Sequence, residues 1–318
     1  MTPPTPRRTA VVALGGHAFI LPGQRGTEQE QAENAARIAP ALLALLERGY
    51  ELVVTHGNGP QVGALLLQNE TEAVPRAPLD VLVAETQGSL GYYLQRSLAD
   101  ELARRGHDRE VVTLVTEVVV DPEDPAFLRP TKPVGPVLSA AEAERRVRDH
   151  GWVVRDDPGR GPRRVVASPE PKRVLQARIV REAVRSGHVV IACGGGGIPV
   201  ARGPAGTTVG IEAVIDKDLT SSMLASEIEA ELFVILTAVD AVMLDFAKPS
   251  ARPLAAVTTR EARAHLAAGQ FPEGSMGPKI LSILRFIERG GRRAIVTSAE
   301  KLEHALDGEA GTHFVGRI

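Results

Sequence analysis

Three of the six lysines in this 318-residue chain lie in turns bounded by proline, glycine or aspartate. They are Lys132 within Pro-Thr-Lys-Pro, Lys217 within Ile-Asp-Lys-Asp and Lys279 within Gly-Ser-Met-Gly-Pro-Lys. Lysine supplies a compact point charge that arginine does not, and arginine is far commoner here, with 31 residues. Phosphoryl transfer needs such charge on the moving group and the leaving oxygen. Taken alone, each lysine is more often a solvated surface residue.

Two aspartates flank Lys217, and the sequence leaves three roles open for them. Asp216 and Asp218 could hold lysine side chains in place, bind Mg²⁺, or cap a helix that begins there. No other grouping of His, Cys and Glu has the spacing of a metal site. We therefore assign no metal ligand to the protein side chains.

Glycine-rich turns follow three apolar runs that are rich in β-branched residues. The turns are Gly15-Gly16, Gly57-Asn58-Gly59 and Gly194–Gly197. Glycine lets backbone N–H groups approach an anion closely, and a helix that starts there adds positive potential. Ligands of parallel α/β sheets bind beyond the carboxyl ends of the strands. Three such turns predict one shared crevice for phosphate groups, although each alone is also typical of a tight turn.

Several standard catalytic motifs are absent from the sequence. No Gly-Lys dipeptide occurs, which excludes a Walker A loop, and the protein-kinase signatures and the Gly-x-Ser-x-Gly elbow are missing. Gly57-x-Gly59-x-x-x-Gly63 misses the dinucleotide-binding fingerprint by one position. The single cysteine, Cys193, precedes a glycine run. It either ends a buried strand or acts as a nucleophile, and the first interpretation is favoured.

Short apolar runs alternate with helical patterns, which predicts a mostly parallel sheet with helices on both faces. We expect strands at 11–14, 52–55, 111–115, 188–192, 232–236 and 294–296. Thr27 and Glu30 form a predicted capping box before a long helix that ends near Gly49, and Pro40 should kink or divide that helix. Further helices are expected at 79–105, 172–185, 219–230 and 278–289.

Residues 121–170 interrupt this alternation. They are rich in Pro, Gly, Asp and Arg, and the stretch is too long for a plain connection. Trp152 and the valines after it favour a small protruding subdomain, and a disordered insertion is the alternative.

Composition excludes several classes of function. The net charge is −2 and aromatic residues make up 3%, which argues against nucleic acid or a membrane surface as a partner. Arg7-Arg8 precedes an apolar run that is too short for an export signal, and no run approaches the length of a membrane span. One cysteine allows no internal disulfide. We expect a cytoplasmic protein.

Seven segments carry a resemblance that runs from Val11 to Thr312. They are Val11–Gly16, Thr55–Gly63, Pro78–Val81, Pro130–Pro136, Cys193–Val200, Glu212–Asp218 and Gly274–Lys279. By these segments the chain resembles the carbamate kinases, which are members of the amino acid kinase family.

The resemblance implies a three-layer α/β/α sandwich around a central, mostly parallel sheet. Residues 1–215 would form an N-terminal lobe that binds the phosphoryl acceptor, with 121–170 as the protruding subdomain. Residues 216–318 would form a C-terminal lobe that binds the nucleotide. The implied reaction is ATP + carbamate ⇌ ADP + carbamoyl phosphate, with Mg²⁺, in a homodimer that serves arginine metabolism.

The resemblance also implies roles for individual residues. Lys217 and Lys279 would bind the transferring phosphoryl group and the nucleotide phosphates, Asp218 would organise these lysines, and Lys132 would reach in from the subdomain. The implied acceptor-side residues are Gly15, Gly16, His17, Gly57, Asn58 and Gly59. The implied nucleotide-side residues are Asp216, Thr237, Asp240 and Met276.

One residue departs clearly from the family pattern. The family usually has asparagine after the paired glycines, and this chain has His17. Histidine is bulkier than asparagine and titrates near neutral pH. Either the substitution is tolerated because the backbone does the binding, or the acceptor is a different small carboxylate or carbamate-like acid. A catalytically silent nucleotide-binding regulator is a third interpretation.

Overall fold

The computed structural model describes residues 8–15, 18–69, 75–157, 161–272 and 274–316. Within them, the strands of the central sheet are β1 (Arg8–Leu14), β2 (Tyr50–His56), β3 (Val111–Thr113), β9 (Val189–Ile191), β12 (Leu232–Leu236), β15 (Ala256–Thr258), β16 (Arg293–Thr297) and β17 (Thr312–Val315). Their order is β15-β17-β16-β12-β1-β2-β9-β3. Only the β16–β17 pair is antiparallel. The prediction of a mostly parallel sheet is confirmed.

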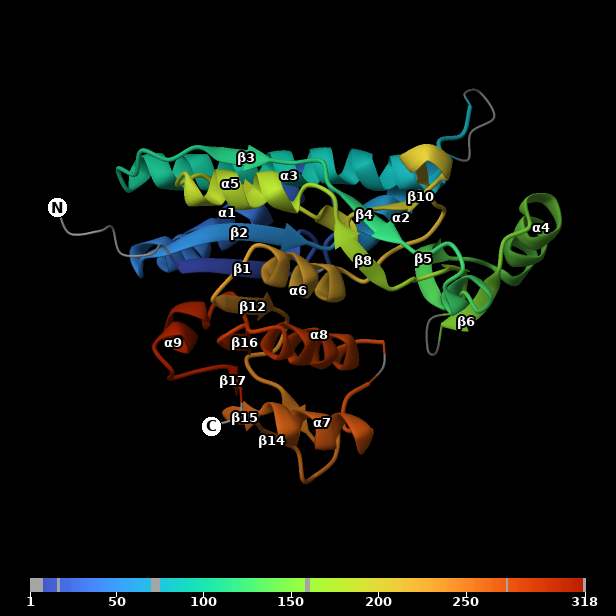
Figure 1. Cartoon of the computed structure of the whole chain (residues 1–318). Helices are drawn as coiled ribbons and strands as arrows, with labels where there is room; N and C mark the ends of the chain where they lie inside the picture. Colours follow the sequence, from blue (N-terminus) through green and yellow to red (C-terminus); the bar gives the residue numbers. More distant parts are fainter. Residues whose placement is uncertain (1–7, 16–17, 70–74, 158–160, 273, 317–318) are drawn as a thin grey trace.

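The central strands are buried on both faces because alternate side chains enter two different cores. On β1, Val12 and Leu14 pack into one core, and Val11 and Ala13 pack into the other. The first core is covered by α1 (Glu28–Glu47), α3 (Leu79–Arg104) and α9 (Leu302–Leu306). The second is covered by α5 (Ala177–Arg185), α6 (Lys217–Glu227), α7 (Thr259–Ala267) and α8 (Met276–Glu288). The result is a three-layer sandwich (Figure 1).

A second sheet lies beyond the carboxyl end of the central strands, against α3. Its order is β11-β10-β4-β8, formed by β11 (Thr208–Gly210), β10 (Ile198–Arg202), β4 (Glu117–Val120) and β8 (Pro171–Val174). A small third core joins this sheet to α2 (Gly59–Gln68) and to the start of α3. A two-stranded ladder, β13 (Met243–Leu244) and β14 (Arg252–Pro253), follows β12.

The predicted protruding subdomain is present (Figure 1). It consists of β5 (Lys132–Val137), α4 (Ala140–His150), β6 (Val154–Asp157) and β7 (Gly161–Val166), with the sheet order β5-β7-β6. The guanidinium of Arg164 lies 4.7 Å from the centre of the Trp152 ring, a cation–π contact that helps to order this small unit. A β-carbon on Gly63 of α2 would lie 3.1 Å from the Cα of Gly135. This glycine pair therefore lets the subdomain backbone dock against α2.

Local signals in the sequence predicted most element types and missed some boundaries. The capping box of Thr27 and Glu30 is confirmed, but α1 continues through Pro40, so the helix is not divided. The helix expected from residue 172 begins at Ala177, because residues 171–174 pair with β4 as strand β8. The second sheet was not predicted, because its strands are short and three of them, β4, β8 and β11, are half-exposed or exposed. No helix within the described residues has both the length and the apolar character needed to cross a membrane.

Two glycines on α3 should respond to alanine in opposite ways. A β-carbon on Gly91 would lie 2.2 Å from Cγ2 of Thr113 on β3, whereas one on the exposed Gly88 meets nothing within 4 Å. We expect Gly91→Ala to destabilise the fold by about 1–3 kcal/mol through overpacking. Gly88→Ala should stabilise it by up to about 1 kcal/mol, because alanine has the higher helix propensity. Urea denaturation of both variants measures this difference, and equal effects would contradict the described packing of α3 on β3.

Candidate active site

Two lysines from different helices converge on one carboxylate. Lys217 is the first residue of α6, and Lys279 lies in the first turn of α8. These helices pack side by side (Figure 1). The Nζ of Lys217 donates to Oδ1 of Asp218 at 2.6 Å, and the Nζ of Lys279 donates to Oδ2 at 2.9 Å. The fold thus brings together three of the predicted site residues.

This cluster is almost entirely withdrawn from water. The side chain of Asp218 is 4% exposed, and both lysine side chains are 14% exposed. Burial by itself raises the pKa of Asp218, but the two ammonium groups outweigh it and lower that pKa to about 2. Burial lowers the pKa of Lys217, and the carboxylate of Asp218 partly offsets this effect. Asp218 is therefore an anion at neutral pH, with its charge shared between two cations.

A third lysine reaches the same helix start from the subdomain. The Nζ of Lys132 on β5 donates to Oδ2 of Asp216 at 2.9 Å. The other oxygen of Asp216 accepts hydrogen bonds from the backbone N–H groups of Asp218 and Leu219, at 2.9 and 3.3 Å, and so caps α6. Asp216 thus combines two of the roles that the sequence left open, since it caps the helix and pairs with a lysine.

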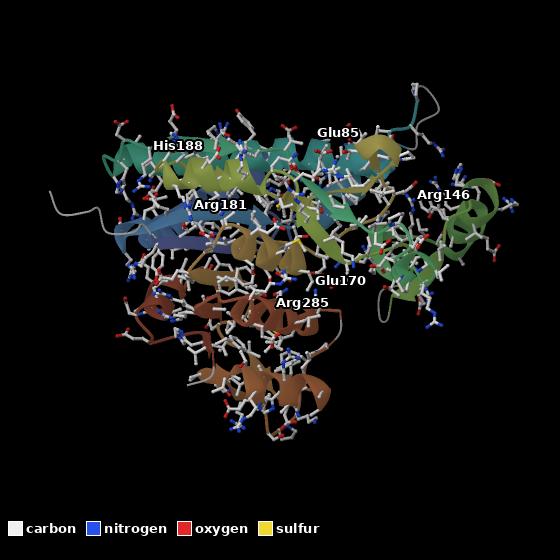
Figure 2. The ribbon with its side chains drawn as sticks, viewed as in Figure 1. Glu85, Arg146, Glu170, Arg181, His188 and Arg285 are labelled. Carbon is white, nitrogen blue, oxygen red and sulfur yellow. The ribbon has the colours of Figure 1, made fainter. Side chains whose placement is uncertain are left out.

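Helix α8 is also connected to the base of the subdomain. Arg285 of α8 forms an ion pair with Glu170, which directly precedes β8 (Figure 2). The backbone N–H of Glu170 donates to Oδ2 of Asp124 at 3.0 Å, which joins the segment that leaves the subdomain to the one that enters it. These two contacts therefore connect helix α8, which carries Lys279, to the base of the subdomain, which carries Lys132.

The glycine turns that follow β1 and β2 meet at the carboxyl edge of the sheet, as predicted. The backbone N–H of Gly15 donates to the carbonyl of Leu236 on β12 at 3.0 Å, and that of Gly57 donates to the carbonyl of Leu14 at 3.2 Å. Gly59 is the first residue of α2. Gly16 and His17 lie outside the described residues.

Asn58 turns its amide away from the helix that it precedes. It occupies the N-cap position of α2 but makes no side-chain cap hydrogen bond, and its Nδ2 instead donates to Oγ1 of Thr86 at 2.8 Å. A β-carbon on Gly195 would lie 2.3 Å from that Nδ2, so the third glycine turn leaves room for the amide. Asn58 thus leaves the N-terminal N–H groups of α2 at the sheet edge without a cap from its own side chain.

His56 ends β2 in a wholly buried position. Burial lowers its pKa to about 4, and the nearby Lys217 contributes in the same direction. One ring nitrogen lies 3.1 Å from the carbonyl of Gly57, and the ring packs edge-on against Phe19 with centres 5.5 Å apart. A neutral imidazole therefore fills the space behind the glycine turns and adds no charge to the lysine cluster.

The residues expected on the nucleotide side are spread over the C-terminal half of the sheet edge. Thr237 follows β12 and donates its N–H to the carbonyl of Thr297 at 2.9 Å. Met276 opens α8, three residues before Lys279, and packs against the core. Asp240 is exposed in the segment between β12 and β13. The described contacts join none of these three residues to Asp218.

Two hydroxyl groups in this region were not predicted from the sequence. Within the described part of the chain, the buried side-chain oxygens of Thr297 and Ser298 have no hydrogen-bond partner. They lie at the carboxyl end of β16, next to Thr237, where a ligand could satisfy them. Their position in the sequence could have identified them, because they directly follow the apolar run 294–296. The glycine turns were identified by the same criterion, their position after an apolar run.

The site has few protein side chains that could act as ligands of a divalent cation. No three His, Cys, Asp or Glu side chains among the described residues are grouped as metal ligands. The two carboxylates at the start of α6, Asp216 and Asp218, are both engaged by lysine ammonium groups. A magnesium ion would fit this site as the partner of nucleotide phosphates and water rather than of a protein cage.

Cys193 should be chemically inert in the folded protein. It is fully buried, and burial raises the pKa of its thiol to about 12, so the reactive thiolate is scarce at neutral pH. We expect no reaction with a thiol-specific disulfide reagent in the native state and one reactive thiol after denaturation. A native thiol that reacted as fast as the denatured one would restore the nucleophile interpretation.

Comparison with known proteins agrees with this geometry. The model of the amino acid kinase family matches residues 8–298. Carbamate kinase of Thermococcus kodakarensis is 45% identical over 313 residues, which cover 97% of this chain and 99% of the relative. A carbamate kinase-like protein of Escherichia coli is 43% identical over 314 residues, with 97% and 99% coverage. The structure of Giardia lamblia carbamate kinase bound to AMP-PNP matches with a TM-score of 0.91 and 36% identity, and covers 98% of this chain and 99% of that one. The chain belongs to the amino acid kinase family and, within it, to the carbamate kinases.

Proposed function

We propose that the protein catalyses the reversible reaction ATP + carbamate ⇌ ADP + carbamoyl phosphate. The observation that carries this proposal is the pair of buried lysines held by Asp218 at the carboxyl edge of the sheet. Its relatives named carbamate kinase match over nearly their full lengths, and the solved structure of one of them has AMP-PNP bound. An ATP-dependent kinase with a small acid as its acceptor follows from both lines of support.

The chemistry requires orientation and charge rather than a general base. A carboxylate oxygen of carbamate attacks the γ-phosphorus while the bond to the β-phosphate oxygen breaks, and no proton moves because the carboxylate is already ionised. Lys217 and Lys279 would each donate to Asp218 and direct their remaining N–H groups toward phosphoryl oxygens. When bound through the nucleotide, Mg²⁺ would neutralise the charge on the β- and γ-phosphates.

We assign the acceptor to the N-terminal lobe, residues 1–215, and the nucleotide to the C-terminal lobe, residues 216–318. Gly15, Gly57 and Asn58 lie at the ends of β1 and β2, on the acceptor side. Thr237, Asp240 and Met276 follow β12 or open α8, on the nucleotide side. Asp216, assigned to the same side, pairs with Lys132 of the subdomain. Lys132 would close over the substrates from the subdomain. A homodimer in the cytoplasm is part of the same proposal.

The first test is the formation of ATP from carbamoyl phosphate, ADP and Mg²⁺, which avoids unstable free carbamate. We expect kcat in the ordinary enzyme range of about 1–10³ s⁻¹. Lys217→Ala and Lys279→Ala should each lower kcat by about 10²-fold or more, as expected for the loss of one transition-state donor. Lys172→Ala, at an exposed position on β8, is the matched control and should retain activity. Near-normal turnover of either site variant would contradict the assigned roles.

The alternative function keeps the fold and changes the acceptor. It is favoured by His17, which replaces the usual asparagine, and by a relative that is named only carbamate kinase-like. If carbamate is the acceptor, His17→Asn should change the KM for carbamoyl phosphate by less than about tenfold and leave the KM for ADP unchanged. Background turnover in the wild type, with activity gained by His17→Asn, would establish a different acceptor. ADP binding without turnover on any small acid would favour a silent regulator.

A further inference from the structure

The turn at residues 193–197 has a backbone conformation, with positive φ, that most residues other than glycine avoid. Cys193 has φ of 52°, and Gly195, Gly196 and Gly197 have φ of 68°, 92° and 85°. The left-handed region is uncommon for a residue other than glycine, so the conformation of Cys193 persists only where its surroundings enforce it. Something in the structure must therefore hold this turn in place.

The side chain of Gln87 on α3 provides that restraint. It is 1% exposed, and its amide makes three hydrogen bonds to backbone groups. Nε2 donates to the carbonyls of Gly194 and Thr116 at 2.9 and 3.2 Å, and Oε1 accepts from the N–H of Thr116 at 2.8 Å. Thr116 completes the connection, because its Oγ1 accepts from the N–H of Cys193 at 2.6 Å.

The restrained turn contacts the active site on two sides. A β-carbon on Gly196 would lie 2.3 Å from the carbonyl oxygen of Ile215, two residues before Lys217. The carbonyl of Gly196 also accepts from Oγ1 of Thr220 in α6 at 2.9 Å. On the other side, Gly195 lies against the amide of Asn58. Any shift of this turn therefore moves the start of α6 and the acceptor-side loop together.

We propose that Gln87 is a positioning residue for phosphoryl transfer. Through Thr116 and the 193–197 turn, it fixes the start of α6, and hence Lys217, relative to the acceptor loop at Asn58. The effect on turnover rests on the proposed function, whereas the restraint of the turn does not. A misplacement of about 1 Å at a reacting centre can lower turnover by about 10²-fold, so a residue that never touches substrate can control the rate.

Four variants separate positioning from a general structural role. Gln87→Met removes the three hydrogen bonds and keeps the approximate size of the side chain. Thr116→Val removes the hydroxyl that holds Cys193, and Thr116→Ser retains it. Gln176→Met is the matched control, because Gln176 accepts from the N–H of Glu117, the residue after Thr116, at 2.8 Å and has no hydrogen bond to the turn.

The kinetic readout is the division between kcat and KM in the formation of ATP. We expect Gln87→Met to lower kcat by about 10²-fold and Thr116→Val by about tenfold, with the KM for ADP changed less than about threefold. Thr116→Ser and Gln176→Met should stay within about threefold of the wild-type kcat. Equal losses in Gln87→Met and Gln176→Met, or in the valine and serine variants, would overturn the proposal.

Hydrogen exchange provides a readout that does not depend on the reaction. Peptides that cover 193–197 and 215–219 should exchange faster in Gln87→Met than in the wild type. Their exchange rates should be unchanged in Gln176→Met. Unchanged exchange in Gln87→Met would overturn the restraint even if the enzyme is active. An inactive wild type with the expected exchange pattern would instead refute the proposed function alone. If Gln87→Met does not fold, the Thr116 pair still decides the question.

Discussion

The carboxylate of Asp218 holds two lysine ammonium groups side by side where little water reaches them. At an effective dielectric constant of about 20, two like charges about 4 Å apart repel by roughly 4 kcal/mol, a large part of the stability of a typical domain. The carboxylate that accepts from both cations offsets this repulsion. The packing of α6 on α8, the cap at Asp216 and the docking of the subdomain through Lys132 all maintain this arrangement.

The two edges of the central sheet differ in which cationic side chains they carry and in what those side chains bind. At the carboxyl edge, N–H groups and lysines converge, which suits phosphate oxygens. At the opposite edge, arginines bind the carbonyls of helix ends: Arg48 donates to Ala44 at 3.3 Å, and Arg293 donates to Ala305 at 3.0 Å. Two of the abundant arginines therefore bind helix ends at this edge. Three of the six lysines, whose compact charge suits a single oxygen, lie at the carboxyl edge.

The glycines of the site have a steric purpose beyond flexibility. Gly194, Gly195 and Gly196 each face a neighbour that a β-carbon would strike, namely His56, Asn58 and Ile215. These contacts bring β2 and the residues that precede α2 and α6 within van der Waals distance at one turn. Close backbone approach thus joins this turn to its neighbours without long side chains.

The sequence by itself determined the local features: apolar runs that become strands, capping signals, glycines at strand ends and the three unusual lysines. These follow from periodicity and residue type, which neighbouring residues decide. The tertiary structure decided which residues meet. Lys279 reaches Asp218 across 61 positions, Lys132 reaches Asp216 across 84, and Gln87 reaches Gly194 across 107. No local pattern encodes such contacts, because they depend on strand order and on helix packing. Gln87 in particular reads as one polar residue in a helix until its partners are known.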